Sequence, residues 1–184
     1  QLERLLTLGD EYLLTIKDIF INQSSELQEL SNRIIYTGFM SNPEGTHKMI
    51  GESIVGVDSY STSEGVFYWG KPGYINKKVF PKKSSDNYIN TIVKNKNSAP
   101  DWISSKNKFF AQIIHPTKSP ASMRILCYRN DKKEATSIAS ALNINSSTIR
   151  ANDSLDFNYQ YYVGPRDYYI LNKYDQSYEK IREF

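Results

Sequence analysis

The segment from Leu155 to Val163 has the most regular alternation of apolar and polar residues in the chain. Every second position is apolar or aromatic, at Leu155, Phe157, Tyr159, Tyr161 and Val163. Polar residues stand between them at Asp156, Asn158 and Gln160. A period of two is typical of a β-strand with one buried face. The pattern therefore predicts a strand, which Gly164-Pro165 ends because proline has no amide for a sheet hydrogen bond.

After this strand the apolar residues follow helical spacing. Pro165 has the φ angle of a first helical position, and Asp167 and Lys173 carry the charges that the two ends of a helix dipole favour. One stripe holds the apolar and aromatic residues Tyr168, Leu171, Tyr174, Tyr178 and Ile181. We therefore expect one or two short amphipathic helices over residues 165–184.

Short apolar runs separated by Gly, Pro, Asn and Ser fill most of the preceding chain. They predict strands over residues 12–21, 33–39, 53–60, 65–70, 109–114 and 121–129. Many short strands with such turn signals are typical of an antiparallel β-sandwich. Residues 1–8 fit either a helical turn or the start of a strand. Residues 134–144 contain alanines that favour helix, but the surrounding β pattern favours a strand.

Composition limits the classes of protein that the chain can be. Its 184 residues are 39% hydrophobic and 13% aromatic, enough for one substantial core, so we expect a single domain over residues 1–184. No apolar run is long enough to span a membrane. The chain starts with Gln1 and shows no signal peptide, so we expect a domain excised from a longer protein.

Positive charge is concentrated in residues 71–108, which hold nine lysines and two aspartates. We expect a long solvated excursion over the sheet. The alternative is a basic face near anionic lipid headgroups or an acidic partner. Nucleic acid is not expected, because the net charge is only +3 and Phe80, Tyr88 and Trp102 have no regular spacing.

The search for reactive side chains yields no catalytic, cofactor or metal site. Phosphate-binding glycine loops, cysteine pairs and metalloprotease motifs are absent from the sequence. The single cysteine, Cys127, lies in a strand-like run, where we expect a small buried hydrophobic residue. His47 and His115 lack further ligands at metal-binding spacing, so we expect both in loops at strand ends.

Three stretches resemble the large periplasmic domain of the YidC-type membrane protein insertases. The corner Tyr161-Tyr-Val-Gly-Pro-Arg-Asp-Tyr168, followed by Leu171 and Tyr174-Asp175, is similar to the end of that domain. Gly9-Asp10-Glu11-Tyr12, followed by an apolar strand and Asn22, resembles an early strand. Trp102-Ile103, followed by Lys108-Phe109-Phe110 and His115-Pro116, resembles the central segment. The stretches occur in the order of the family and touch most of the chain.

The resemblance implies a fold and a role. The fold would be a twisted antiparallel β-supersandwich, similar to sugar mutarotases, with a short C-terminal helix over residues 165–184 that connects to a membrane span. The chain would be the periplasmic domain, or its larger C-terminal part, of a bacterial inner-membrane insertase, and as a fragment it would be monomeric. It would be non-catalytic and need no cofactor. It would dock to accessory components of the Sec translocon, meet nascent membrane proteins and position the membrane part. The residues expected to bind a partner are Tyr168, Tyr174, Tyr178 and Ile181, which could alternatively pack the helix on the sheet.

Two other functions remain open from the sequence. The first is a binding module for an extended peptide or glycan, with a groove lined by exposed aromatics such as Tyr68, Trp69 or Tyr162. The second rests on the mutarotase-like fold alone, in which His115 and an acid such as Glu52 or Glu64 would act on a sugar ring. No spacing in the sequence supports that pairing.

Overall fold

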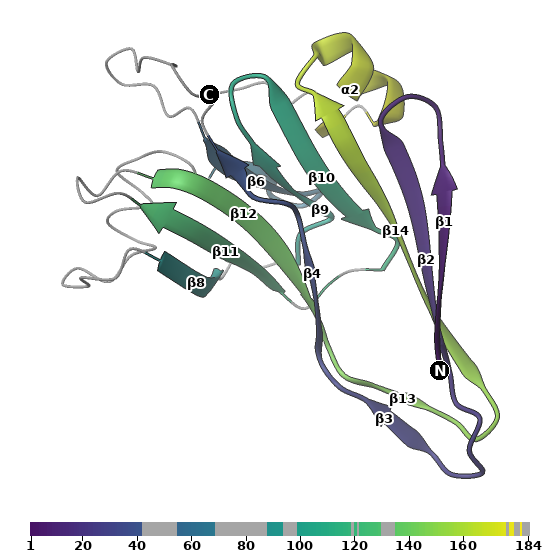
Figure 1. Ribbon diagram of the computed structural model, residues 1–184. Helices are drawn as coiled ribbons and strands as arrows, with labels where there is room; N and C mark the ends of the chain where they lie inside the picture. The colour runs from purple at the N-terminus through teal and green to yellow at the C-terminus, as the bar shows by residue number, and fades with distance from the viewer. Residues whose placement is uncertain are drawn as a thin grey trace.

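The computed structural model forms two large antiparallel sheets, a two-stranded arm and one short helix (Figure 1). It describes residues 1–41, 55–68, 88–93, 99–118, 120, 122–129, 135–175, 177, 178 and 181. The predicted all-β architecture with a short C-terminal helix is confirmed. No helix among these residues is long and apolar enough to cross a membrane.

The larger sheet has seven strands in the order β1-β2-β14-β10-β9-β6-β7. Every neighbouring pair is antiparallel. The bounds in that order are Leu2–Leu8, Leu13–Ile21, Ser154–Pro165, Phe110–Pro116, Trp102–Lys106, Gly56–Ser61 and Gly65–Tyr68. The last strand of the chain, β14, therefore lies inside the sheet, between β2 and β10. Residues 1–8, which the sequence left open, form the edge strand β1.

The smaller sheet has four strands on its main path, in the order β4-β12-β11-β8. Their bounds are Arg33–Tyr36, Ala135–Ile144, Ser122–Arg129 and Tyr88–Val93, and β5 (Met40–Ser41) also pairs with β12. The arm consists of β3 (Gln28–Leu30) and β13 (Ser147–Ile149) and projects away from both sheets (Figure 1). The alanine-containing segment therefore forms a strand over residues 135–144. Consecutive residues of β12 from Ile138 to Leu142 are buried, so both of its faces are covered, and the small alanine side chains fit there.

Aliphatic and aromatic side chains from both sheets fill the space between them. The larger sheet supplies Ile16, Val57, Ile103, Ile114, Phe157 and Tyr159. The smaller sheet supplies Met123, Ile125, Cys127, Ile138, Leu142 and Ile144. Alternation along each strand directs these residues to one face, as expected for packed sheets. Cys127 is buried, as predicted for a small hydrophobic residue.

The predicted lysine-rich excursion is wrong for two of its segments. Tyr88–Val93 is strand β8, and Trp102–Lys106 is strand β9, in which every residue is buried. Lys106 can be buried because an aspartate on the neighbouring strand pairs with it, a partner that lies 48 positions earlier in sequence. A count of lysines cannot reveal such a partner. Residues 69–87 and 94–98 lie outside the described residues.

Strand β14 confirms the predicted terminal strand, but its buried face changes along its length. Phe157 and Tyr159 point into the core between the sheets, as the alternation predicted. Near the end of the strand, Tyr162 and Gly164 are buried instead, and Val163 is exposed. The reason is that the opposite face of the sheet is covered there by Leu171 of the helix α2 (Tyr168–Tyr174) and by Tyr178 and Ile181 after it.

Pro165 is the last residue of β14, so the prediction of Pro165 as a first helical residue is wrong. The helix begins at Tyr168, and Asp167 is its N-cap. The carboxylate of Asp167 accepts hydrogen bonds from the amides of Tyr169 (2.9 Å) and Ile170 (3.2 Å). These bonds satisfy two of the amides that a helix start leaves unpaired. Lys173 lies in the last turn, as predicted.

Gly164 gives a direct test of this corner. A Cβ atom on Gly164 would lie 2.6 Å from Cγ of Tyr12 and 2.7 Å from the hydroxyl of Tyr162. We expect Gly164→Ala to lower the free energy of unfolding by about 1–3 kcal/mol, because a buried methyl group has no room there. Urea denaturation of the variant and of Val163→Ala, the exposed neighbour, measures the difference. Equal midpoints for the two variants would contradict this account of the corner.

Candidate functional site: the C-terminal segment and the adjoining groove

The residues after β14 pack on the outer face of the larger sheet, opposite the core between the sheets. We call residues 166–181 the C-terminal segment. Leu171, Tyr178 and Ile181 of this segment are fully buried. They contact side chains of three strands of the sheet, namely Trp102 of β9, Ala111 and Ile113 of β10 and Tyr162 of β14. The larger sheet is therefore buried on both faces where the segment covers it.

Side-chain hydrogen bonds attach the C-terminal segment to the sheet at separate points. The indole Nε1 of Trp102 donates to Oγ of Ser177 at 2.8 Å. Nδ1 of His115 lies 2.9 Å from the hydroxyl of Tyr178, and 3.7 Å from Oδ2 of Asp175. Burial raises the pKa of Tyr178, so its hydroxyl stays neutral as a hydrogen-bonding group. These contacts hold the segment in one position on the sheet.

A buried ion pair makes a further attachment. Nζ of Lys106 lies 2.9 Å from Oδ2 of Asp58, and the two side chains are 0% and 1% exposed. Ser104 also donates to Oδ2 of Asp58, at 3.2 Å. The same Nζ of Lys106 donates to the main-chain carbonyl of Ile181 at 3.0 Å. One lysine therefore connects β6, β9 and the C-terminal segment.

The electrostatics of this pair favour a fixed geometry. Burial raises the pKa of Asp58, and the charge of Lys106 opposes that rise. Each buried charge is stable only while the other stays within contact distance, because neither can be solvated by water. The ring of Tyr68 also lies 4.8 Å from Nζ of Lys106, a cation–π distance. Displacement of Ile181 would remove one of the groups that solvate the buried ammonium.

The predicted partner-binding residues differ in their exposure. Tyr178 and Ile181 are 1% and 0% exposed and pack the C-terminal segment against the sheet, so no partner reaches them in this structure. Tyr168 and Tyr174 are half-buried and retain exposed surface. Sequence reasoning missed Tyr169, which is 82% exposed and packs edge to face with Tyr168. It was missed because it lies off the apolar stripe, and that stripe marks the packed side of the helix. Partner binding by Tyr168 and Tyr174 stays a prediction.

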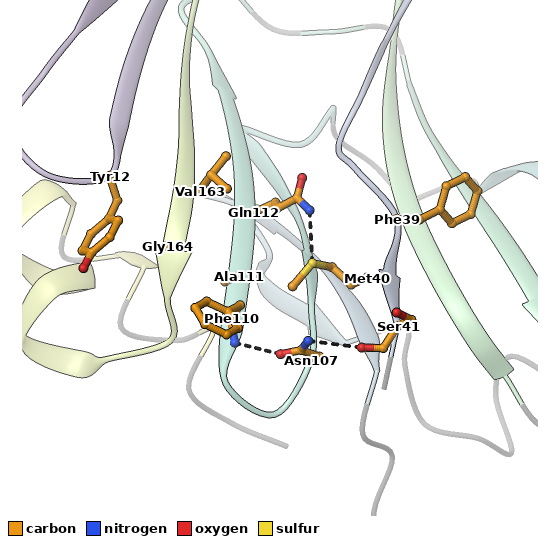
Figure 2. Close-up of a pocket in the computed structure, with 10 residues that line it drawn as sticks. All are labelled: Tyr12, Phe39, Met40, Ser41, Asn107, Phe110, Ala111, Gln112, Val163 and Gly164. Atoms are coloured by element: carbon orange, nitrogen blue, oxygen red, sulfur yellow. Dashed lines mark hydrogen bonds between the residues drawn. The ribbon is translucent and has the colours of Figure 1, made fainter. Parts of the chain in front are cut away.

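Beside the C-terminal segment, an open groove runs between the larger sheet and β5 (Figure 2). It has a volume of about 380 Å³. Its lining is mainly apolar and comprises Tyr12, Phe39, Met40, Ser41, Asn107, Phe110, Ala111, Gln112, Val163 and Gly164. We call this set of residues the groove. Asn107 joins its two sides, because Nδ2 donates to the carbonyl of Ser41 at 3.2 Å and Oδ1 accepts from the amide of Phe110 at 2.8 Å.

The amide of Gln112 is fixed within the groove. Its Oε1 accepts from the amide of Gly38 at 2.6 Å and from the hydroxyl of Tyr161, and its Nε2 lies 3.1 Å from Sδ of Met40. A Cβ atom on Gly38 would lie 2.8 Å from Oε1 of Gln112, so a larger residue there would displace the amide of Gln112. The groove thus offers apolar walls and immobilised amides. Such a surface can bind apolar side chains, and the described residues that line it include no carboxylate or imidazole for acid–base catalysis.

The residues that the sequence suggested for a ligand groove do not form this one. Tyr162 is fully buried beneath the C-terminal segment, which contradicts its expected exposure. Tyr68 is half-buried with its ring against Lys106, and Trp69 lies outside the described residues. The aromatic residues of the groove are Tyr12, Phe39 and Phe110. They come from turns and strand ends, where alternation gives no signal.

The proposed sugar chemistry also finds no support in the geometry. His115 lies next to the last residue of β10 and meets Tyr178 and Asp175 rather than Glu64, which lies in the turn between β6 and β7. Glu52 and His47 lie outside the described residues. Among the residues that the structure does describe, no three His, Cys, Asp or Glu side chains come close enough to hold a metal ion.

Replacement of Lys106 tests the buried attachment. We expect Lys106→Met to lower the free energy of unfolding by about 3–5 kcal/mol, because Asp58 would be left as an uncompensated buried charge. The double variant Lys106→Met with Asp58→Leu should recover much of that loss. Hydrogen exchange should be faster in the C-terminal segment of both variants, which lack the bond to Ile181. Lys108→Met, an exposed lysine two positions away, is the control. If Lys106→Met matched this control in stability and exchange, the attachment would be refuted.

Comparison with known proteins identifies the family of this chain. The family model described as the YidC periplasmic domain matches residues 1–184, the whole chain, and confirms the resemblance inferred from the Gly164-Pro165 corner. Comparison with curated proteins finds no significant match. A solved TPR-domain containing protein from Parabacteroides distasonis ATCC 8503 is similar with 9% identity and a TM-score of 0.46. The similarity covers 86% of this chain but only 29% of that one, and we base no argument on it. The chain belongs to the YidC periplasmic domain family, whose members are periplasmic domains of membrane protein insertases.

Proposed function

We propose that this domain docks to an accessory component of the Sec translocon, positions the membrane part of its insertase and catalyses no reaction itself. The observation that carries this proposal is the attachment of the C-terminal segment. Buried side chains and the Lys106–Asp58 pair fix this segment on the larger sheet. A segment fixed in this way would transmit the orientation of the sandwich to the residues that follow it.

Positioning needs a connection that resists rotation as well as separation. Apolar contacts alone allow some sliding, because the hydrophobic effect has no direction. Three hydrogen bonds connect the sheet to the segment at different points. Trp102 bonds to Ser177, His115 to Tyr178, and Lys106 to the carbonyl of Ile181. Because these bonds start from two different strands, they resist rotation of the segment about any one of them.

Docking needs an exposed surface on the C-terminal segment itself. On α2, the half-buried ring of Tyr168 and the exposed ring of Tyr169 lie 5.4 Å apart between centroids. Tyrosine is enriched at protein interfaces because it combines apolar area with a polar group. Lys173 on the same helix is half-exposed, and its Nζ lies 3.6 Å from Oε1 of Glu11. We therefore place the docking surface on the outer side of α2, around Tyr168 and Tyr169.

Site-specific photocrosslinking in the full-length insertase tests this placement. A benzophenone amino acid in place of Tyr169 should crosslink to a Sec accessory component, because that side chain points to solvent beside the attached segment. The same replacement at Tyr128, an exposed tyrosine on β11 of the other sheet, is the matched control. Crosslinking at Tyr128 equal to that at Tyr169, or none at either, would count against docking through α2.

A second candidate function rests on the groove. Phe39, Phe110 and Val163 are exposed there, and the walls offer apolar contacts next to fixed amides. An extended apolar segment of a nascent membrane protein, or a peptide, would bury those side chains; a glycan is a less suitable ligand for so apolar a lining.

Fluorescence anisotropy with a labelled leucine-rich peptide tests the groove. Phe110→Glu should weaken binding by about tenfold or more, because a charge would replace a large apolar contact. Leu5→Glu, an exposed position on the edge strand β1 outside the groove, should leave the affinity unchanged. Equal affinities for the two variants would exclude the groove as the peptide site.

A further inference from the structure

A separate cavity lies where the two-stranded arm leaves the sandwich, on the far side of the core from the groove. We call it the arm pocket. Its polar and charged walls are Arg33, Lys118, Asn145, Ser147 and Asp156, and Phe157 contributes apolar surface. Four parts of the chain meet here, namely the start of β4, the connection after β10, the turn before β13 and the start of β14. The volume of the pocket is about 240 Å³, enough for a small polar group.

Arg33 provides the first observation for a ligand. It is the first residue of β4, and its Cζ lies 4.7 Å from the ring centroid of Phe20, so the guanidinium stacks on the sheet. Its Nη1 is buried and has no hydrogen-bond partner among the described residues. The nearby carboxylate of Asp18 is already held by Arg4, through two bonds of 2.6 and 2.9 Å. A buried donor without an acceptor is costly, and a shift of the guanidinium into the arm pocket, which Arg33 lines, would let a bound anion satisfy it.

The balance of charge in the arm pocket also favours an anion. Lys118 adds a second positive charge, and no ion pair involves it among the described residues. Among the described residues of the lining, Asp156 is the carboxylate, and it forms an ion pair with Lys17. Burial lowers the pKa of Arg33, and the charge of Asp18 opposes that shift. Asn145 and Ser147 can donate further hydrogen bonds.

We propose that Arg33 and Lys118, with Asn145 and Ser147, bind a phosphate group in the arm pocket. A phosphate suits these walls because its oxygens point in several directions. It can accept from the planar guanidinium of Arg33 on one wall and from Lys118 on another. A carboxylate offers only two acceptor oxygens in one plane, so it can satisfy fewer of these donors at once than a phosphate can. The phosphate can come from free phosphate or from a lipid headgroup, since both offer the same oxygens.

Nuclear magnetic resonance titration of the 184-residue chain with inorganic phosphate tests the site, with chloride added to hold ionic strength constant. We expect saturable shifts at the amides of Arg33, Lys118 and Ser147. Arg33→Gln should weaken binding by about tenfold or more, because it removes charge-assisted hydrogen bonds to the anion. Lys118→Gln should weaken it by about threefold, because this exposed ammonium is partly screened. Lys108→Gln, an exposed lysine at the other end of β10, should bind like the unmodified chain.

Two further measurements make the result decisive. Because Lys118 is exposed, Lys118→Gln should keep the spectrum of the folded chain. If Arg33→Gln does not fold, the affinity of Lys118→Gln for phosphate tests the proposal instead. Flotation with phosphatidylglycerol vesicles identifies the source, since loss of vesicle binding in Lys118→Gln but not Lys108→Gln would point to a lipid headgroup. Binding of inorganic phosphate alone would point to the free ion. No saturable shifts, or equal affinities for Lys118→Gln and Lys108→Gln, would overturn the proposal.

Discussion

The double burial of strand β14 is the constraint on which the rest of the structure depends. In the first half of the strand, Phe157 and Tyr159 pack against the smaller sheet. Near its end, Tyr162 packs beneath the C-terminal segment. A strand in the middle of a sheet can serve two cores in this way because alternate side chains point to opposite faces. The sandwich and the C-terminal segment are therefore joined by one continuous piece of backbone, with β2 and β10 hydrogen-bonded on either side.

The buried ion pair of Lys106 and Asp58 determines where the end of the packed segment lies. Replacing a buried pair by apolar residues is often neutral for stability, so the benefit of Lys106 and Asp58 lies elsewhere. Lys106 bonds to the carbonyl of Ile181 as well as to Asp58, and this second bond selects one position for the end of the segment. Such selection is useful if the domain positions the membrane part of an insertase, because an orientation is then what the fold has to maintain.

The groove and the arm pocket offer different chemistry. The groove is apolar, and Gln112 and Asn107 are engaged in hydrogen bonds within the protein. The arm pocket contains an arginine whose Nη1 has no acceptor among the described residues. Hydrogen-bonded amides beside apolar walls suit an apolar chain, whereas an unmet cationic donor suits an anion. Occupancy of one cavity does not require occupancy of the other.

The sequence by itself determined the strand from Leu155, the Gly164-Pro165 corner, the short helix and the family, because these depend on local alternation, backbone chemistry and a contiguous motif. It also identified Leu171, Tyr178 and Ile181 as one stripe. Only the tertiary structure decided that Tyr178 and Ile181 pack inward, that Tyr162 is buried and that Lys106 lies in the interior. The reason is that periodicity reports which residues share a face, whereas burial depends on what covers that face. The partners of Tyr178 and Lys106, which are His115 and Asp58, come from distant parts of the chain.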